Sequence, residues 1–270
     1  MGRKAIVRPS ALRSRGAAAL PVLWHFPASH YNEKARWTLD WKGIPHRRVA
    51  LGPTYLPRAW WRTGHGSLPI LILDGVPIGD STRIIETLER RQPAPALYPK
   101  EPAARTRALA LEEFFDEEVA PQARAYFVHT MFTLSPELAV DFYGLARGAA
   151  FRRVLRVIMP VFEQLYRRRH RVSAATAEEG ARRLPQVLDR VESELQPSGY
   201  LVGDHFTVAD LTAASILGLL AADPKQLQYP LPRSPAWLLD IRNQVHRRTA
   251  GQWVSEMYRR HRGVSAEVAR

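Results

Sequence analysis

The sequence predicts a small α/β domain followed by an all-helical domain. Residues 21–98 contain short apolar segments of strand length, with helical segments between and after them. After Pro99 the apolar residues recur at helical spacing, and no segment has a convincing strand pattern. A chain of 270 residues is long enough for two packed domains, and we place the second at residues 99–262.

The first elements predicted are a strand, a helix and a second strand. Val22–Phe26 is a short apolar run closed by a proline, which indicates a buried strand. Ser29 is a suitable N-cap for a helix over Tyr31–Lys42, and Gly43 ends that helix. Arg47–Leu51 supplies the second extended segment. This βαβ order predicts two parallel strands.

A hairpin and another helix follow. Pro69–Leu73 and Val76–Ile78 flank the pair Asp74-Gly75, and an Asp-Gly pair between apolar runs strongly indicates a hairpin. A helix over Arg83–Arg91 comes next. The order βαβ followed by ββα is that of a thioredoxin-like domain, so we predict this fold for residues 21–98.

The second domain is predicted from helical patterns alone. The patterns cover residues 103–132, 151–170, 176–195, 207–222 and 235–260. Pro160 is expected to interrupt and kink one of these helices.

One segment of the first domain is expected to be irregular. This segment, Gly52–Gly66, is rich in proline, glycine and aromatic residues.

One of these helices has a clear start signal. Thr207 as N-cap and Asp210 three residues later form a capping box, with Phe206 and Leu211 as a hydrophobic staple. We expect this helix to nucleate the core of the second domain.

Charge and composition narrow the classes of function. Lys and Arg number 39 against 26 Asp and Glu, a net charge of +13. We assign the basic clusters to solvent-exposed faces of helices. The alternative hypothesis is that the protein associates with nucleic acid through a basic N-terminal arm. Residues 1–20 form this basic arm and contain no acidic residue. We expect the arm to be disordered, and a transit peptide would have the same composition. Residues 263–270 are expected to be a tail.

The absence of cysteine excludes several kinds of site. Disulfides, thiolate metal sites and cysteine nucleophiles are all ruled out by the composition. No apolar run approaches the roughly 18 residues of a membrane-spanning helix. We therefore expect a cytoplasmic protein with no membrane span and no metal.

Candidate functional residues lie at the starts of two helices and at one proline. Ser29 at a helix N-terminus can donate to an anion and stabilise a thiolate, with His25, Tyr31 and Asn32 as rivals for that role. Asp80 with the helix start beside it could hold an ammonium and a carboxylate, as in an amino-acid head group. Taken alone, each position also suits a simple helix cap. Ser-Leu-Pro at 67–69 could hold a cis bond or be an ordinary strand edge.

The combination and order of these segments resemble the glutathione transferase superfamily over about residues 20–260. The resemblance is to the omega-like and other Ser or Cys classes more than to the Tyr classes. The matching segments are Ser29–Leu39, Leu68–Leu71, Gly79–Ile84, and Tyr200–Asp204 leading into Thr207–Asp210.

The resemblance implies a glutathione site. Leu68 would pair through its main chain with the cysteinyl unit, with cis-Pro69 behind it. Asp80 and Ser81 would hold the γ-glutamyl amine and carboxylate, although Asp is one methylene shorter than the usual Glu. Arg62 falls near the position that contacts the glycyl carboxylate. Glutathione, or a related low-molecular-weight thiol, would be the co-substrate.

The resemblance also implies an activity. Ser29 occupies the slot of the catalytic Ser or Cys, and a serine there argues against thiol transfer and dehydroascorbate reduction. Conjugation, addition or elimination, and peroxide reduction remain, which are reactions of detoxification on a small hydrophobic electrophile. The expected second-substrate pocket between the domains is lined from one helix by Tyr126, Phe127, His129 and Phe132.

The family usually forms dimers, so a homodimer is expected. The alternative function is a non-catalytic glutathione-binding, ligand-binding or protein-interaction protein on the same scaffold, because fold alone does not determine activity.

Overall fold

The first domain contains a four-stranded mixed sheet. The computed structural model describes residues 19–145, 147–229 and 233–268, so most of the predicted basic arm lies outside the described residues. The strand order is β2-β1-β3-β4, in which β1 pairs parallel with β2 and antiparallel with β3, and β3 pairs antiparallel with β4. The strands are β1 Val22–His25, β2 Arg47–Ala50, β3 Ile70–Leu73 and β4 Val76–Gly79.

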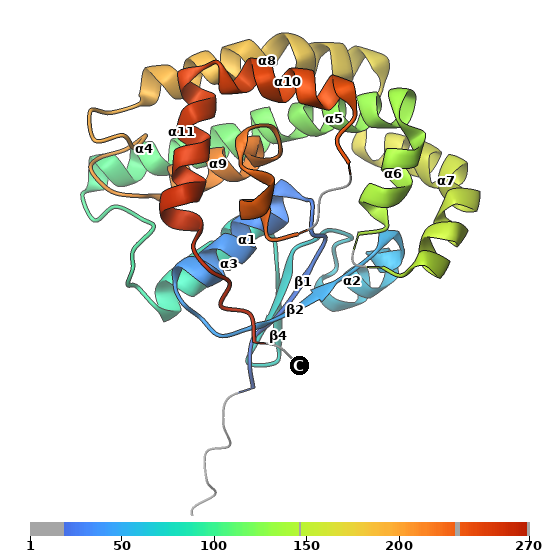
Figure 1. Ribbon diagram of the computed structural model, residues 1–270. Coiled ribbons are helices and arrows are strands. Elements are labelled where there is room, and N and C mark those ends of the chain that lie inside the picture. Colours follow the sequence, from blue (N-terminus) through green and yellow to red (C-terminus); the bar gives the residue numbers. More distant parts are fainter. Residues whose placement is uncertain (1–18, 146, 230–232, 269–270) are drawn as a thin grey trace, which may run out of the picture.

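Three α-helices accompany the sheet. They are α1 His30–Trp41, α2 Leu56–Thr63 and α3 Ser81–Arg91, and the short η1 Pro53–Tyr55 precedes α2. Figure 1 shows α1 and α3 together on one side of the strands and α2 apart from them. The βαβ-ββα order confirms the predicted thioredoxin-like fold.

The expectation of an irregular segment at 52–66 is wrong, because this segment contains α2. Pro57 lies in the first turn of the helix, where its missing N–H costs nothing, and Gly64 ends the helix with a φ of 70°. The proline and glycine therefore mark the two ends of a short helix.

The second domain is all-helical, which confirms the predicted fold class (Figure 1). Its centre is α9, in which nearly every side chain is buried. The helices are α4 Pro102–Glu113, η2 Phe114–Val119, α5 Ala120–Leu134, α6 Pro136–Tyr143, α7 Ala149–His170, α8 Ala174–Glu194, α9 Val208–Ala221, η3 Pro224–Leu227, α10 Ala236–His246, α11 Thr249–Met257 and η4 Tyr258–Arg262.

The predicted capping box at the start of α9 is present. The main-chain N–H and the hydroxyl of Thr207 both donate to Asp210 Oδ2 at 2.8 Å, and the N–H of Leu201 donates to Asp210 Oδ1 at 2.8 Å. Asp210 is fully buried, so its carboxylate joins the preceding loop to the helix in the core.

Three helical expectations need correction. Pro160 does not interrupt α7, which continues to His170, and the buried residues Leu155 and Met159 lie in the half before the proline. The pattern at 235–260 is two helices, α10 and α11. A Cβ at Gly251 would lie 2.1 Å from the Val245 carbonyl oxygen, so the glycine permits the close turn between them. Helix α6 was not predicted from the sequence.

Buried ion pairs join the two domains. Lys34 on α1 pairs with Glu112 of α4 at 3.1 Å and also with Asp116 of η2. Arg262, at the end of η4, pairs with Glu33 at 2.6 Å and Asp40 at 2.7 Å on α1. These contacts fix α1 against the helical domain.

The segment after η4 returns to the first domain. His46, just before β2, forms a parallel bridge with Glu267, and the N–H of Val268 donates to the His46 carbonyl at 2.8 Å. Across the described ranges, every helix is too short or too polar to cross a bilayer.

Candidate active site

Strand register brings three loop segments to one edge of the sheet. Trp24 near the end of β1 pairs with Ile70 at the start of β3, and Ile70 pairs on its other side with Gly79 at the end of β4. The segments just beyond these strand ends are therefore neighbours. They contain five predicted site residues, Ser29, Leu68, Pro69, Asp80 and Ser81.

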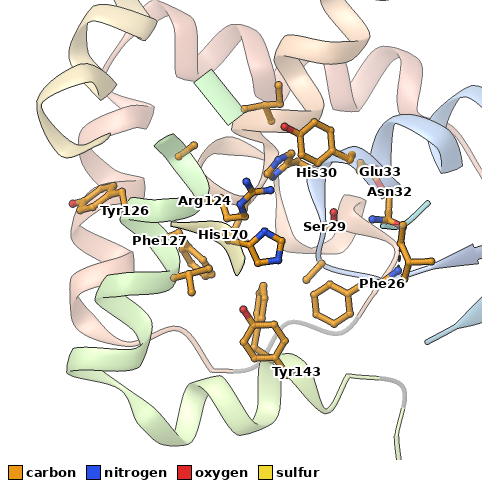
Figure 2. A pocket seen from close by; sticks show the side chains of 18 of the residues that line it. Phe26, Ser29, His30, Asn32, Glu33, Arg124, Tyr126, Phe127, Tyr143 and His170 are labelled. Atoms are coloured by element: carbon orange, nitrogen blue, oxygen red, sulfur yellow. Dashed lines mark hydrogen bonds between the residues drawn. The ribbon is translucent and has the colours of Figure 1, made fainter. Parts of the chain in front are cut away.

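Ser29 is the N-cap of α1 and lines a cavity between the domains. Its N–H donates to the Phe26 carbonyl at 3.2 Å, and its carbonyl accepts from Glu33 at 2.9 Å. Within the described chain its hydroxyl makes no capping hydrogen bond. Figure 2 shows Ser29 facing the cavity. The hydroxyl is thus available to a ligand beside the positive end of the helix dipole.

The three rival residues differ from Ser29 in what their side chains contact. His25 is buried, and burial, followed by the charge of Arg36, lowers its pKa well below the usual value. The Tyr31 hydroxyl donates to the Asp116 carbonyl at 2.8 Å, and Asn32 Oδ1 accepts from the Phe26 N–H at 3.2 Å.

Leu68 and Pro69 lie where β3 begins. Leu68 lines the cavity, and the Leu68–Pro69 peptide bond is cis. Because the last ladder pair here is Trp24 with Ile70, the main chain of Leu68 lies beyond the paired strands. Its polar groups can therefore meet an extended ligand.

Asp80 and Ser81 lie at the start of α3. Asp80 is an exposed N-cap with a φ of 73°, and its Oδ1 accepts from the Arg83 N–H at 3.1 Å. Ser81 is buried. An acidic side chain beside free helix N–H groups can hold an ammonium and a carboxylate at the same place.

Arg62 lies apart from the cavity. It is exposed on α2, and its guanidinium lies over the rings of Trp24 at 5.6 Å and Trp61 at 5.0 Å. Because it does not line the cavity, it can contact only a ligand that extends out of the cavity.

The cavity has a volume of about 400 Å³ and is mainly apolar. Of the predicted pocket residues on α5, Tyr126 and Phe127 line it, whereas His129 and Phe132 do not. His129 Nδ1 lies 2.8 Å from Arg167 Nη1, and Phe132 is buried in the core. At about 3.6 residues per turn, these four positions are spread over more than half of the helix circumference, so one cavity cannot be lined by all of them.

Helices α6 and α7 supply a wall of the cavity that the sequence analysis missed. Their cavity-lining aromatic residues are Phe142, Tyr143, Phe162 and Tyr166. Arg169, also on α7, donates to the Gly66 carbonyl of the first domain. The aromatic stripe of α7 was visible in the sequence, but the same pattern suits ordinary core packing.

Three more polar residues in the cavity were also missed: His30, Arg124 and His170. Figure 2 shows them close together, with Arg124 extending from α5. Burial, then the charge of Arg124, lowers the pKa of His30 to about 3 and that of His170 to about 4. Both imidazoles are therefore neutral at neutral pH. Among the described residues no cluster of His, Asp and Glu is placed to hold a metal ion.

Two family models match the chain. The model of the glutathione S-transferase N-terminal domain matches residues 8–96, and that of the glutathione S-transferase C-terminal domain matches residues 154–244. Together they cover more than half of the chain.

Two curated relatives differ in what their names describe. A probable glutathione S-transferase of Nicotiana tabacum is 26% identical over 106 residues, 38% of this chain and 46% of the relative. The chain thus matches about half the length of that relative. FtsZ-localized protein A of Caulobacter vibrioides is 21% identical over 204 residues, 74% of this chain and 76% of the relative.

Solved structures share the fold. FzlA from C. crescentus has a TM-score of 0.55 at 21% identity, covering 78% of this chain and 84% of its own. The beta-etherase LigF from Sphingobium has a TM-score of 0.58 at 20% identity, and the match covers 88% of this chain and 99% of LigF. A glutathione S-transferase from Methylobacillus flagellatus with glutathione bound has a TM-score of 0.51 at 20% identity. That match covers 87% of this chain and 98% of the transferase.

Proposed function

This chain belongs to the glutathione S-transferase superfamily, and we propose that it is a transferase that activates the glutathione thiol through Ser29 for attack on a small hydrophobic electrophile. The observation that carries the proposal is the position of Ser29. Its hydroxyl faces the cavity without a capping bond. The Tyr31 hydroxyl instead donates to a main-chain carbonyl, and Asn32 Oδ1 accepts from a main-chain N–H.

In this proposal the first domain holds glutathione along the sheet edge. The main chain of Leu68, with Pro69 behind it, pairs with the cysteinyl unit. Asp80 and Ser81 bind the γ-glutamyl amine and carboxylate, and Arg62 meets the glycyl carboxylate outside the cavity. A relative of similar fold holds glutathione, which supports the choice of thiol.

The chemistry follows from the position of the thiol. Ser29 donates a hydrogen bond to the sulfur, and the helix dipole of α1 favours its anionic form, so the thiol proton is lost to solvent more readily. The sulfur then bonds to the electrophilic carbon. In a substitution the leaving group departs with the bonding electron pair. The apolar cavity excludes water from the thiolate and binds the electrophile.

Calorimetric titration with glutathione tests the proposal. We expect wild-type protein to bind glutathione and Asp80→Ala to bind it roughly tenfold or more weakly, because a charge-assisted hydrogen bond is lost. Asp240→Ala, which removes an exposed acid from α10, is the matched control and should bind normally. Absence of binding at millimolar glutathione would contradict the proposal.

One observation favours an alternative without catalysis. A relative matched over most of this chain is named for localisation with FtsZ and not for a reaction. The alternative is a glutathione-binding, ligand-binding or protein-interaction protein on this scaffold. It predicts no conjugation above the solution rate with 1-chloro-2,4-dinitrobenzene or other electrophiles, even where glutathione binds.

We also propose that the chain is cytoplasmic and forms a homodimer, as the family commonly does. Light scattering on the purified chain should give twice the monomer mass. A monomer at micromolar concentration would contradict the dimer.

A further inference from the structure

Arg124 is a cation in the cavity that pairs with no acidic side chain of the described residues. It lies on α5 and extends into the cavity beside His30 and His170 (Figure 2). Its Nε is buried and has no hydrogen-bond partner, and within residues 19–145, 147–229 and 233–268 its guanidinium forms no ion pair.

The other charged side chains around the cavity are already engaged. Glu33, the one acid among the described lining residues, pairs with Arg36 and with Arg262. Of the lining cations, Arg169 donates to the Gly66 carbonyl and Arg183 pairs with Glu179 at 2.7 Å. Arg124 differs from both, because the part of the chain that the structure describes gives it no such partner.

Arg124 is half-buried, and a charged group whose Nε is buried without a hydrogen-bond partner is unfavourable. Arginine stays protonated at any pH a protein experiences, so it cannot relieve the cost by losing its proton. An anion in the cavity would relieve it, and the fork of N–H donors matches a carboxylate. The charge therefore points to a ligand that carries an anionic group.

The surroundings of Arg124 suit the same kind of ligand. Its charge contributes to the lowered pKa of both His30 and His170, so these rings act as neutral hydrogen-bonding groups beside it. His30 Nε2 is also buried without a hydrogen-bond partner among the described residues. Most of the remaining wall is aromatic or aliphatic, so a ligand here is apolar apart from its anionic end.

We propose that Arg124 binds a carboxylate on the second substrate, so that the cavity selects aromatic or apolar electrophiles carrying a carboxylate. The proposal rests on the proposed transferase function. The carboxylates of glutathione are assigned to the sheet edge at Ser81 and to Arg62, whereas Arg124 belongs to the helical wall with Phe127. It is a specificity-determining residue of the second-substrate pocket.

The test compares two unreactive ligands of almost equal shape on the full chain. Naphthalene-2-carboxylate and naphthalene-2-carboxamide are titrated by calorimetry into wild type, Arg124→Met, Arg124→Lys and Arg153→Met. Arg153 is exposed on α7, so its variant loses the same charge away from the cavity. We expect wild type and Arg153→Met to bind the carboxylate about ten- to a hundredfold more tightly than the amide.

In Arg124→Met this preference should disappear, and in Arg124→Lys part of it should remain, because lysine keeps the charge but not the fork. The melting temperature of Arg124→Met should not fall, since the variant removes a buried Nε that has no hydrogen-bond partner among the described residues. Equal affinities in wild type, no binding of either ligand, or a preference that survives in Arg124→Met would each overturn the proposal.

Glutathione titration of the same samples separates this proposal from the one on which it rests. Glutathione binding without a carboxylate preference overturns the role of Arg124 alone. A carboxylate preference without glutathione binding supports the anion site and contradicts the transferase function.

Discussion

At the scale of single residues, the site depends on polar side chains whose hydrogen-bonding capacity is left for a ligand. Ser29 caps α1 by its backbone alone, and its hydroxyl faces the cavity. Serine hydroxyls at helix starts usually bond to the helix N–H groups. A hydroxyl that does not can instead donate to an anion held at the helix end.

Replacing Ser29 should therefore affect the thiol more than the affinity for glutathione. In Ser29→Ala we expect the bound thiol pKa to rise by about 1 to 2 units, because one hydrogen bond to the thiolate is lost. The ultraviolet absorbance of the thiolate, followed against pH, measures this. Ser67→Ala, a change in another serine lining the cavity, is the control. An unchanged pKa in Ser29→Ala would remove Ser29 from the mechanism.

His30 makes the stability of the fold depend on pH. Its pKa falls from 6.5 to about 3, by burial first and then by the charges of Arg124 and Lys34. Between these values the unfolded chain binds the proton and the folded chain does not, so stability falls as the pH drops. The loss is absent above pH ~7, where the ring is neutral in both states.

Comparison with His30→Gln isolates this residue from other titrating groups. From pH ~6 to ~4 we expect the wild type to lose about 1.4 kcal/mol of unfolding free energy per pH unit relative to His30→Gln. Urea unfolding at each pH measures both proteins. A difference that stays constant with pH would show that His30 is not held neutral.

At the scale of elements, the start of α9 shows how one buried side chain organises a helix. Asp210 accepts hydrogen bonds from Leu201 and Thr207, and its pKa is raised to about 6 because burial outweighs these bonds. Removing the carboxylate would leave buried donors without an acceptor.

We expect Asp210→Ala to lower the free energy of unfolding by about 2 to 5 kcal/mol, since at least two buried donors lose their acceptor. Asp204→Ala is the control, because Asp204 is exposed in the loop just before this helix and its loss should cost less than about 0.5 kcal/mol. Denaturant unfolding measures both. Similar losses would show that the capping box contributes little.

At the scale of the whole molecule, the two domains meet through buried charge. Lys34 is fully buried between Glu112 and Asp116, and the Thr82 hydroxyl donates to Glu112 at 3.0 Å. Burial raises the pKa of Glu112 despite the opposing charge of Lys34. Loss of the ammonium would leave two acids together without a counter-charge.

Lys34→Met should therefore destabilise the fold by about 3 to 5 kcal/mol. Lys100→Met, which removes an exposed lysine between the two domains, is the matched control and should have little effect. Thermal and urea unfolding measure both variants. A loss below about 1 kcal/mol for Lys34→Met would mean that the domains are held mainly by apolar packing.

Local signals in the sequence predicted much of the fold and part of the site. The Asp74-Gly75 hairpin, the cap at Thr207 and the order of strands and helices all follow from residues a few positions apart. The same local signals did not predict α2, because Pro57 and Gly64 are compatible with a short helix as well as with a loop.

The sequence by itself determined the thioredoxin-like and helical domains and the candidate residues Ser29 and Asp80, because caps, turns and periodicity depend on near neighbours. Only the tertiary structure decided which side chains share the cavity. His30, Arg124 and His170 belong to α1, α5 and α7, and no local pattern relates them. Their meeting depends on how distant helices pack, which is set by the summed contacts of many side chains.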